Sequence, residues 1–75
     1  MNYEYAEPFL EIKFGNTSDG KSVRIKKSLI TDIYEYCEEG KFRVKIHFVR
    51  GNENTWYRFF GTMEEFEKNS KIVYL

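Results

Sequence analysis

Cys37, His47 and Glu35 have side chains that could support catalysis in this 75-residue chain, which has one cysteine and one histidine. A hydrolytic triad needs a nucleophile beside a histidine that a carboxylate orients. We expect Asp32 opposite His47 on a neighbouring strand, but the pattern places no serine or second cysteine beside that pair. Cys37 is expected to point inward beside Phe42, as a small hydrophobic residue. We therefore predict that the protein is not an enzyme.

Glu35 is the only carboxylate that the strand pattern places on an apolar face. Acid–base catalysis uses carboxylates whose pKa is shifted in a cleft, whereas Glu35 is expected near a strand end, where it reaches water as a rim residue. A metal site needs three or four suitably spaced ligands, which one histidine and one cysteine do not supply. The glycine patterns of phosphate-binding loops are also missing, so we predict no cofactor and no metal.

The charged residues change sign in blocks along the chain. Twelve basic and twelve acidic residues give a net charge of zero and a pI near 6.6. Residues 21–31 sum to +4, residues 32–39 to −4 and residues 40–50 to +4. On neighbouring strands such blocks pair opposite charges across the ladder, so one interpretation is a solvated sheet face.

The other interpretation is a binding face on which basic residues alternate with aromatic ones. Arg24 and Lys26 are expected to share this face with eight candidate binding residues: Tyr34, Tyr36, Arg43, Lys45, His47, Trp56, Arg58 and Phe60. Tyrosine, tryptophan and arginine contribute most of the binding energy at protein interfaces. The same mixture suits single-stranded nucleic acid, whose phosphates are neutralised and whose bases stack on rings.

Alternating apolar and polar residues indicate strands through most of the chain. In the first strand, Leu10, Ile12 and Phe14 share the inward face, and the turn formers of residues 15–20 close a hairpin. A short bend at Ser28–Leu29 precedes the third strand. The expected strands cover residues 9–14, 22–26, 30–38, 42–49 and 55–60.

Two turns set the expected registers. Glu39-Gly40 can serve as a two-residue loop, because glycine accepts a positive φ without steric cost. The cross-strand pairs that this loop predicts are Asp32–His47, Tyr34–Lys45, Tyr36–Arg43 and Cys37–Phe42. A four-residue turn over 51–54 is expected to pair Val49 with Trp56 and His47 with Arg58.

Residues 62–65 (Thr-Met-Glu-Glu) have the form of a capping box, with Thr62 as N-cap and Glu65 at the third helical position. Met63 and Phe66 give the short helix that follows one apolar stripe, and a helix of about two turns needs tertiary contacts. Residues 71–75 are either a closing strand or the docked end of this helix.

These elements predict one domain over residues 1–75, with residues 1–7 as a tail. The expected fold is mainly β (α+β): an antiparallel meander of about five strands, open or closed as a small SH3-like barrel, with one short C-terminal helix. So small a domain buries a marginal core, and without a disulfide or metal this favours a homo-oligomer. With no apolar run near ~18 residues and no secretory leader, we expect a cytoplasmic protein without membrane contact.

The stretch from Val23 to Phe66 resembles two bacterial families. Residues 30–33 (Ile-Thr-Asp-Ile) and 62–65 resemble the Ile-x-x-Ile bend and the ES-x-EE helix start of FlbD-like small β-rich proteins. Residues 32–36 (Asp-Ile-Tyr-Glu-Tyr) and 63–66 are similar to a strand and a helix in the core of LytTR DNA-binding domains. The chain is shorter than LytTR domains, and the resemblance implies the fold without assigning a functional residue.

We expect a small binding module, a self-associating adaptor or inhibitor that contacts a protein partner through the eight candidate residues. The alternative is nucleic acid or a nucleotide bound on the same face, as in a phage or mobile-element accessory protein. A net charge of zero favours the protein partner, because non-specific nucleic-acid binders carry a positive excess.

Overall fold

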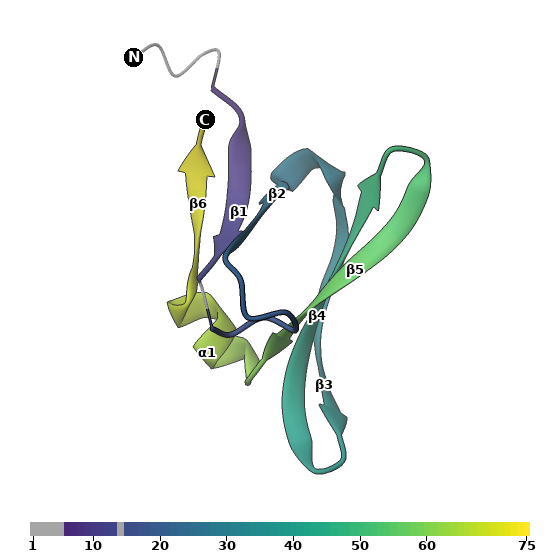
Figure 1. Ribbon diagram of the computed structural model, residues 1–75, viewed down its shortest axis with the longest axis vertical. Coiled ribbons are helices and arrows are strands. Elements are labelled where there is room, and N and C mark those ends of the chain that lie inside the picture. The colour runs from purple at the N-terminus through teal and green to yellow at the C-terminus, as the bar shows by residue number, and fades with distance from the viewer. Residues whose placement is uncertain (1–5, 14) are drawn as a thin grey trace.

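Two three-stranded antiparallel sheets and one short helix make up the computed structural model, which describes residues 6–13 and 15–75 (Figure 1). In the first sheet β1 (Pro8–Ile12) lies between β2 (Val23–Lys26) and β6 (Ser70–Tyr74). In the second, β4 (Lys41–Arg50) lies between β3 (Ile30–Glu38) and β5 (Glu53–Phe60). The 3-10 helix η2 (Lys27–Leu29) leads from the first sheet to the second, and α1 (Met63–Lys68) leads back.

The mainly β fold with a short helix near the C-terminus is confirmed. The closing segment is a strand, because β6 pairs along β1 from Pro8–Tyr74 to Ile12–Ser70. The six described strands therefore form two sheets. The only described bridge outside the named strands joins Thr17 to Phe59, and no closed barrel forms in the described part of the chain. Glu7, expected in the tail, exchanges two backbone hydrogen bonds with Leu75.

The core lies between the two sheets and under the helix. Alternation in β1 and β4 turns every second residue inward, as the apolar pattern predicts. Phe59 is fully buried, and its ring meets that of Phe66 edge-on with the centroids 5.4 Å apart. The buried hydrophobic residues are Leu10, Ile12, Ile25, Val44, Ile46, Phe48, Phe59 and Phe66. Of the expected inward residues, Phe14 lies outside the described residues.

The hairpin of β3 and β4 has the predicted register at every expected pair. Glu39 and Gly40 both have positive φ, at 52° and 77°, as a type I′ turn requires. The register between β4 and β5 was predicted wrongly, by two residues: His47 lies opposite Trp56, and Val49 opposite Asn54. The loop there has two residues, Gly51-Asn52, rather than four. A shift of two leaves every side chain on its predicted face.

The capping box at the start of α1 is confirmed. The Thr62 hydroxyl accepts a hydrogen bond from the Glu65 N–H at 3.2 Å, and the Glu65 carboxylate accepts one from the Thr62 N–H at 3.1 Å. Glu35 completes the cap, because its carboxylate accepts the Met63 N–H at 2.7 Å. A negative charge is favourable at a helix N-terminus, so Glu35 holds the helix against β3.

Cys37 is exposed, so the prediction that it points into the core is wrong. It does lie opposite Phe42, but Phe42 is itself 49% exposed. In Figure 1 the hairpin end of β3 and β4 extends beyond the helix and the first sheet. The inward face therefore has no layer to cover it at this end.

The loop between β1 and β2 is fastened to β5. The Ser18 N–H donates to the Arg58 carbonyl, and the Tyr57 hydroxyl donates to the Asp19 carboxylate. This last hydrogen bond, more than any other group, lowers the pKa of Asp19 below its usual value. Burial, followed by the bond to Asp19, raises the pKa of Tyr57 above its usual value.

Candidate binding face

The outer face of β3, β4 and β5 brings all eight candidate residues together. Because side chains alternate along each strand, those next to the buried Val44 and Ile46 point away from the core. The residues fall in three cross-strand rows: Tyr36–Arg43–Phe60, Tyr34–Lys45–Arg58 and Asp32–His47–Trp56. We call Tyr34, Tyr36, Arg43, Lys45, His47, Trp56, Arg58 and Phe60 the aromatic-basic face.

The basic groups of this face lie over its aromatic rings. The Lys45 ammonium is 4.5 Å from the centroid of Trp56 and 5.1 Å from that of Tyr36. The Arg43 guanidinium is 4.7 Å from the ring of Phe60, and that of Arg58 lies between Trp56 and Phe60 at 5.6 and 5.7 Å. Each such contact contributes about 0.5–1 kcal/mol at an exposed site. Together they order the side chains of this face.

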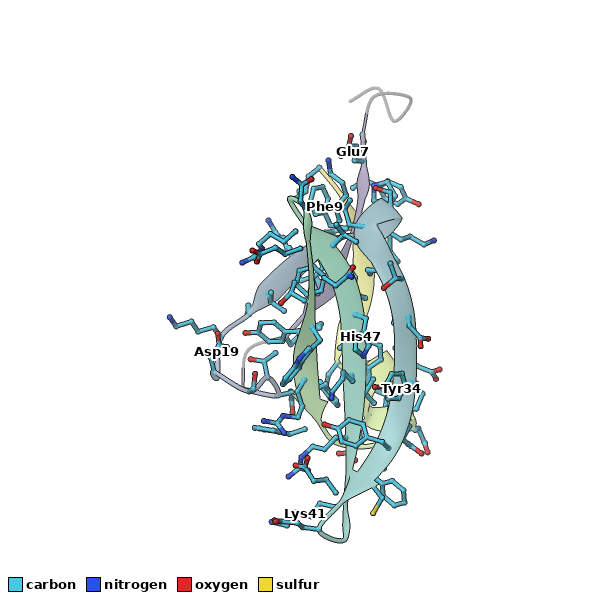
Figure 2. All side chains as sticks on the ribbon, turned by 90° about the vertical axis from the view of Figure 1, so that its right-hand side faces the viewer. Glu7, Phe9, Asp19, Tyr34, Lys41 and His47 are labelled. Atoms are coloured by element: carbon cyan, nitrogen blue, oxygen red, sulfur yellow. The ribbon has the colours of Figure 1, made fainter. Side chains whose placement is uncertain are left out.

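His47 contacts Tyr34 rather than a carboxylate. Its Nε2 lies 3.1 Å from the Tyr34 hydroxyl, and the two rings stack with centroids 5.5 Å apart. Figure 2 shows both side chains next to each other on this side of the sheet. Asp32 is opposite His47 in register, as predicted. The contact between Tyr34 and His47 was not predicted. These residues are diagonal neighbours, and the predicted register named only directly opposed pairs.

Three of the aromatic rings remain accessible. Trp56 is 45% exposed, Phe60 40% and Tyr34 37%. Beside them, the hydroxyl of Tyr36 and the Nε atoms of Arg43 and Arg58 are buried without a hydrogen-bond partner among the described residues. These three atoms can donate hydrogen bonds, and a buried polar group without a partner is costly. The face therefore combines accessible aromatic area with three donor atoms that lie buried beneath it.

The charge of the face is partly balanced at its rim. Glu38, at the end of β3, lies 3.2 Å from the Arg58 guanidinium. Lys45 and Arg43 take part in no described ion pair. Glu38 was not among the residues predicted for this face, although the acidic block of residues 32–39 next to a basic block was a usable signal.

Arg24 and Lys26 do not extend this face, contrary to prediction. They lie on β2, which pairs with β1 in the other sheet and not with β3. Each has an acidic partner there: Arg24 lies 2.7 Å from Glu11, and Lys26 lies 2.9 Å from Glu7. The error arises because the chain changes sheets at η2, where a continuous meander was expected.

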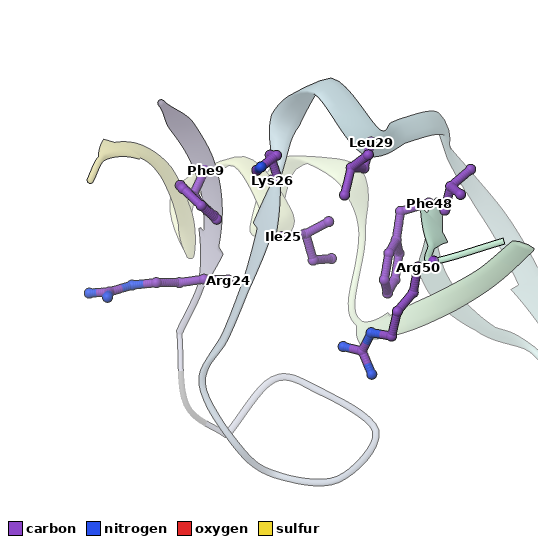
Figure 3. Close-up of a pocket in the computed structure, with 9 residues that line it drawn as sticks. Phe9, Arg24, Ile25, Lys26, Leu29, Phe48 and Arg50 are labelled. Carbon is purple, nitrogen blue, oxygen red and sulfur yellow. The ribbon is translucent and has the colours of Figure 1, made fainter. Parts of the chain in front are cut away.

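A shallow hollow of about 280 Å³ opens between β2 and the end of β4 (Figure 3). Ile25 and Phe48 form its floor, Leu29 its upper wall, and Arg50 lies at its rim with its guanidinium 5.8 Å from the Phe48 ring. Arg24 and Lys26 border it as well, but both have acidic partners. The hollow offers less exposed aromatic surface than the aromatic-basic face.

Among the described residues, no cluster of three or more histidine, cysteine or acidic side chains could hold a metal ion. None of the helices in the described ranges is long and apolar enough to cross a membrane. No protein-family model, curated protein or solved structure matches the chain. The resemblance to FlbD-like and LytTR proteins stays a prediction.

Proposed function

We propose that this protein is a non-enzymatic, self-associating binding module, an adaptor or inhibitor, that binds a protein partner on its aromatic-basic face. The observation that carries the proposal is the set of exposed rings held in place by cations. Trp56 is the most exposed of these rings, and it contacts both Lys45 and Arg58. Exposed aromatic residues beside arginine are typical of the residues that dominate protein interfaces.

The cations of the face indicate what the partner supplies. Lys45 and Arg43 take part in no described ion pair. A protein segment rich in carboxylates and carbonyl groups would provide the acceptors while its apolar side chains cover Trp56 and Phe60. The order of the face before binding favours affinity, because less side-chain entropy is lost on association.

Selection from a random library of short displayed peptides tests this proposal. We expect enriched peptides to carry acidic residues next to apolar ones. Trp56→Ala should weaken their binding by about 2 kcal/mol, or roughly 30-fold. Phe42→Ala, which removes an equally exposed ring outside the face, is the matched control and should bind as the wild type does. Peptides that bind Trp56→Ala and the wild type equally would refute the proposal.

Single-stranded nucleic acid is the second candidate for the same face. The observation in its favour is that Lys45 and Arg43 lie among accessible rings on an open sheet and take part in no described ion pair. Against it, these cations already cover ring surface that a base would need for stacking, and Arg58 is paired with Glu38. A fluorescent (dT)12 oligonucleotide tests it directly.

If three phosphates contact Arg43, Lys45 and Arg58, the affinity for (dT)12 should fall about 20-fold between 50 and 200 mM salt. That result, with loss of binding in Trp56→Ala, would establish the second candidate and displace the first. Absence of measurable (dT)12 binding at 50 mM salt would dismiss it.

A further inference from the structure

Each sheet ends in two edge strands, and three of these four either carry more than one charged side chain or are partly covered by a loop. Charged side chains and covering loops are the usual forms of protection. The edge strand β2 carries Arg24 and Lys26. The edge strand β3 carries three acidic residues within nine positions: Asp32, Glu35 and Glu38.

The edge of β5 is partly covered. The loop between β1 and β2 runs along its second half, where the Ser18 N–H donates to the Arg58 carbonyl at 3.1 Å and the Phe60 N–H donates to the Asn16 carbonyl at 2.9 Å. Covering the edge with a loop is a second common form of protection.

β6 is the edge strand with the least protection within the described residues. Its only charged residue, Lys71, has its ammonium 3.9 Å from the Glu11 carboxylate of β1, so its charge is partly neutralised inside the sheet. Ile72 is 41% exposed, and Leu75, directly after the strand, is 56% exposed. An edge strand with exposed apolar residues and a single charged residue is the one that pairs most readily with another strand.

The backbone of β6 is oriented for such pairing. Leu75 exchanges two backbone hydrogen bonds with Glu7, at 3.0 and 3.1 Å, and the Asn69 carbonyl accepts the Lys13 N–H. In an antiparallel ladder the bonding groups of successive residues point to alternate sides. Odd-numbered residues of β6 therefore bond to β1, and the N–H and C=O of Ile72 point away from β1.

We propose that a second copy of this chain pairs with β6 in an antiparallel ladder, about a twofold axis at Ile72. The inference deepens the self-association in the proposed function, and rests on it, by naming the surface that two copies share. In this register Lys71 lies opposite Val73 of the partner subunit, so like charges do not face each other. The result is a continuous six-stranded sheet with the order β2-β1-β6-β6-β1-β2, in which the last three strands belong to the second copy.

The charge pattern favours β6 over the other edges for self-pairing. Two copies of β3 about an axis at Glu35 would place Glu35 against itself and Asp32 against Glu38, and like charges directly opposed are destabilising. Pairing through β6 also stops at a dimer, because both copies use the same edge and neither has a second β6 edge left to pair. The aromatic-basic face lies on the other sheet, so the dimer presents two such faces.

Sedimentation velocity over a range of concentrations tests the inference. The wild type should form a dimer at high concentration, and Ile72→Lys, which opposes two lysines across the axis, should remain a monomer. Phe42→Lys introduces the same charge at an exposed apolar position on the other sheet and should still dimerise. A wild type that stays monomeric, or an Ile72→Lys variant that dimerises like the wild type, would overturn the inference.

Hydrogen exchange separates loss of the dimer from loss of the fold. The Ile72 amide should exchange more slowly as the wild type is concentrated, while the Val73 amide, bonded to β1, should be protected at every concentration. Exchange at Ile72 that does not depend on concentration would contradict the β6 ladder. Trp56→Ala should leave the dimer intact, so failure of peptide binding and failure of dimerisation are distinguishable. Dissociation of the dimer by Trp56→Ala would instead overturn the β6 surface.

Discussion

Replacing Phe59 with alanine should remove much of the stability of the protein, whereas replacing Trp56 with alanine should remove distinctly less. The two aromatic residues lie three positions apart on β5, so their side chains point to opposite faces of the sheet. The pair therefore tests which face is the core and which is the binding face.

The magnitudes follow from burial and contacts. Phe59 is 0% exposed and packs edge-on against Phe66, and a phenylalanine truncated in such a core costs about 3–5 kcal/mol. A 75-residue domain has roughly 4–11 kcal/mol of total stability. Trp56 is 45% exposed. Its truncation removes the contacts with Lys45 and Arg58, at about 0.5–1 kcal/mol each.

Urea unfolding followed by far-ultraviolet circular dichroism is the assay, because Trp56→Ala lacks the only tryptophan of the chain. With a slope of about 1 kcal/mol per molar urea, Trp56→Ala should lower the midpoint by roughly 1–2 M. Phe59→Ala should lower it by about 3 M or more, or leave no folded baseline. Equal losses in the two variants would refute the assignment of the two faces.

Three further predictions concern the cap, the pH dependence and the thiol. Thr62→Ala should lower the free energy of unfolding by about 1 kcal/mol, because it removes the acceptor for the Glu65 N–H. Because the pKa of Asp19 is lowered in the folded state, its contribution to stability is present above its usual pKa of 3.8 and is lost as the pH falls through the lower folded value. Tyr57→Phe should weaken this acid dependence in urea titrations between pH 5 and 2, since the Tyr57 hydroxyl is the main cause of the shift. Cys37 should react fully with a thiol reagent in the native protein, without denaturant, because it is exposed.

Each of these predictions has an outcome that would contradict it. Thr62→Ser keeps the accepting oxygen and should keep the stability, so an equal loss in Thr62→Ser and Thr62→Ala would remove the capping argument. An unchanged acid dependence in Tyr57→Phe would show that other carboxylates control it. If Cys37 reacted only after addition of urea, the hairpin end would be covered in solution.

Local signals in the sequence were sufficient for the turns and the helix cap. A two-residue loop containing glycine fixes both its own geometry and the register of the strands beside it, which is why every predicted pair between β3 and β4 is present. The capping box depends on two residues three positions apart, so it needs no knowledge of the rest of the fold. The eight residues of the aromatic-basic face were also predicted together from a local signal. Side chains alternate along a strand, so the sequence determines which of them share one face of the sheet.

Long-range pairing could not be predicted in the same way. β1 and β6 are separated by almost the whole chain, and no local pattern indicates that they pair. The second β-turn was ambiguous, since Gly51, Asn52 and Asn54 all favour turns. The burial of Cys37 depended on whether the opposite sheet reaches the hairpin end, which is a property of the tertiary arrangement. Arg24 and Lys26 were assigned to the wrong face for the same reason. The chain passes from the first sheet to the second at η2, and this change is also a property of the tertiary arrangement.

The fluorescence of Trp56 gives the most direct test of the central claim, that the aromatic-basic face binds a protein segment. As the only tryptophan, it reports on this face and on no other part of the molecule. Titration with the most enriched peptide from the displayed library should give a saturable change in its emission, and titration with (dT)12 should give none. Peptide binding detected by calorimetry without any change in Trp56 emission would contradict the claim, because the peptide would then occupy another surface.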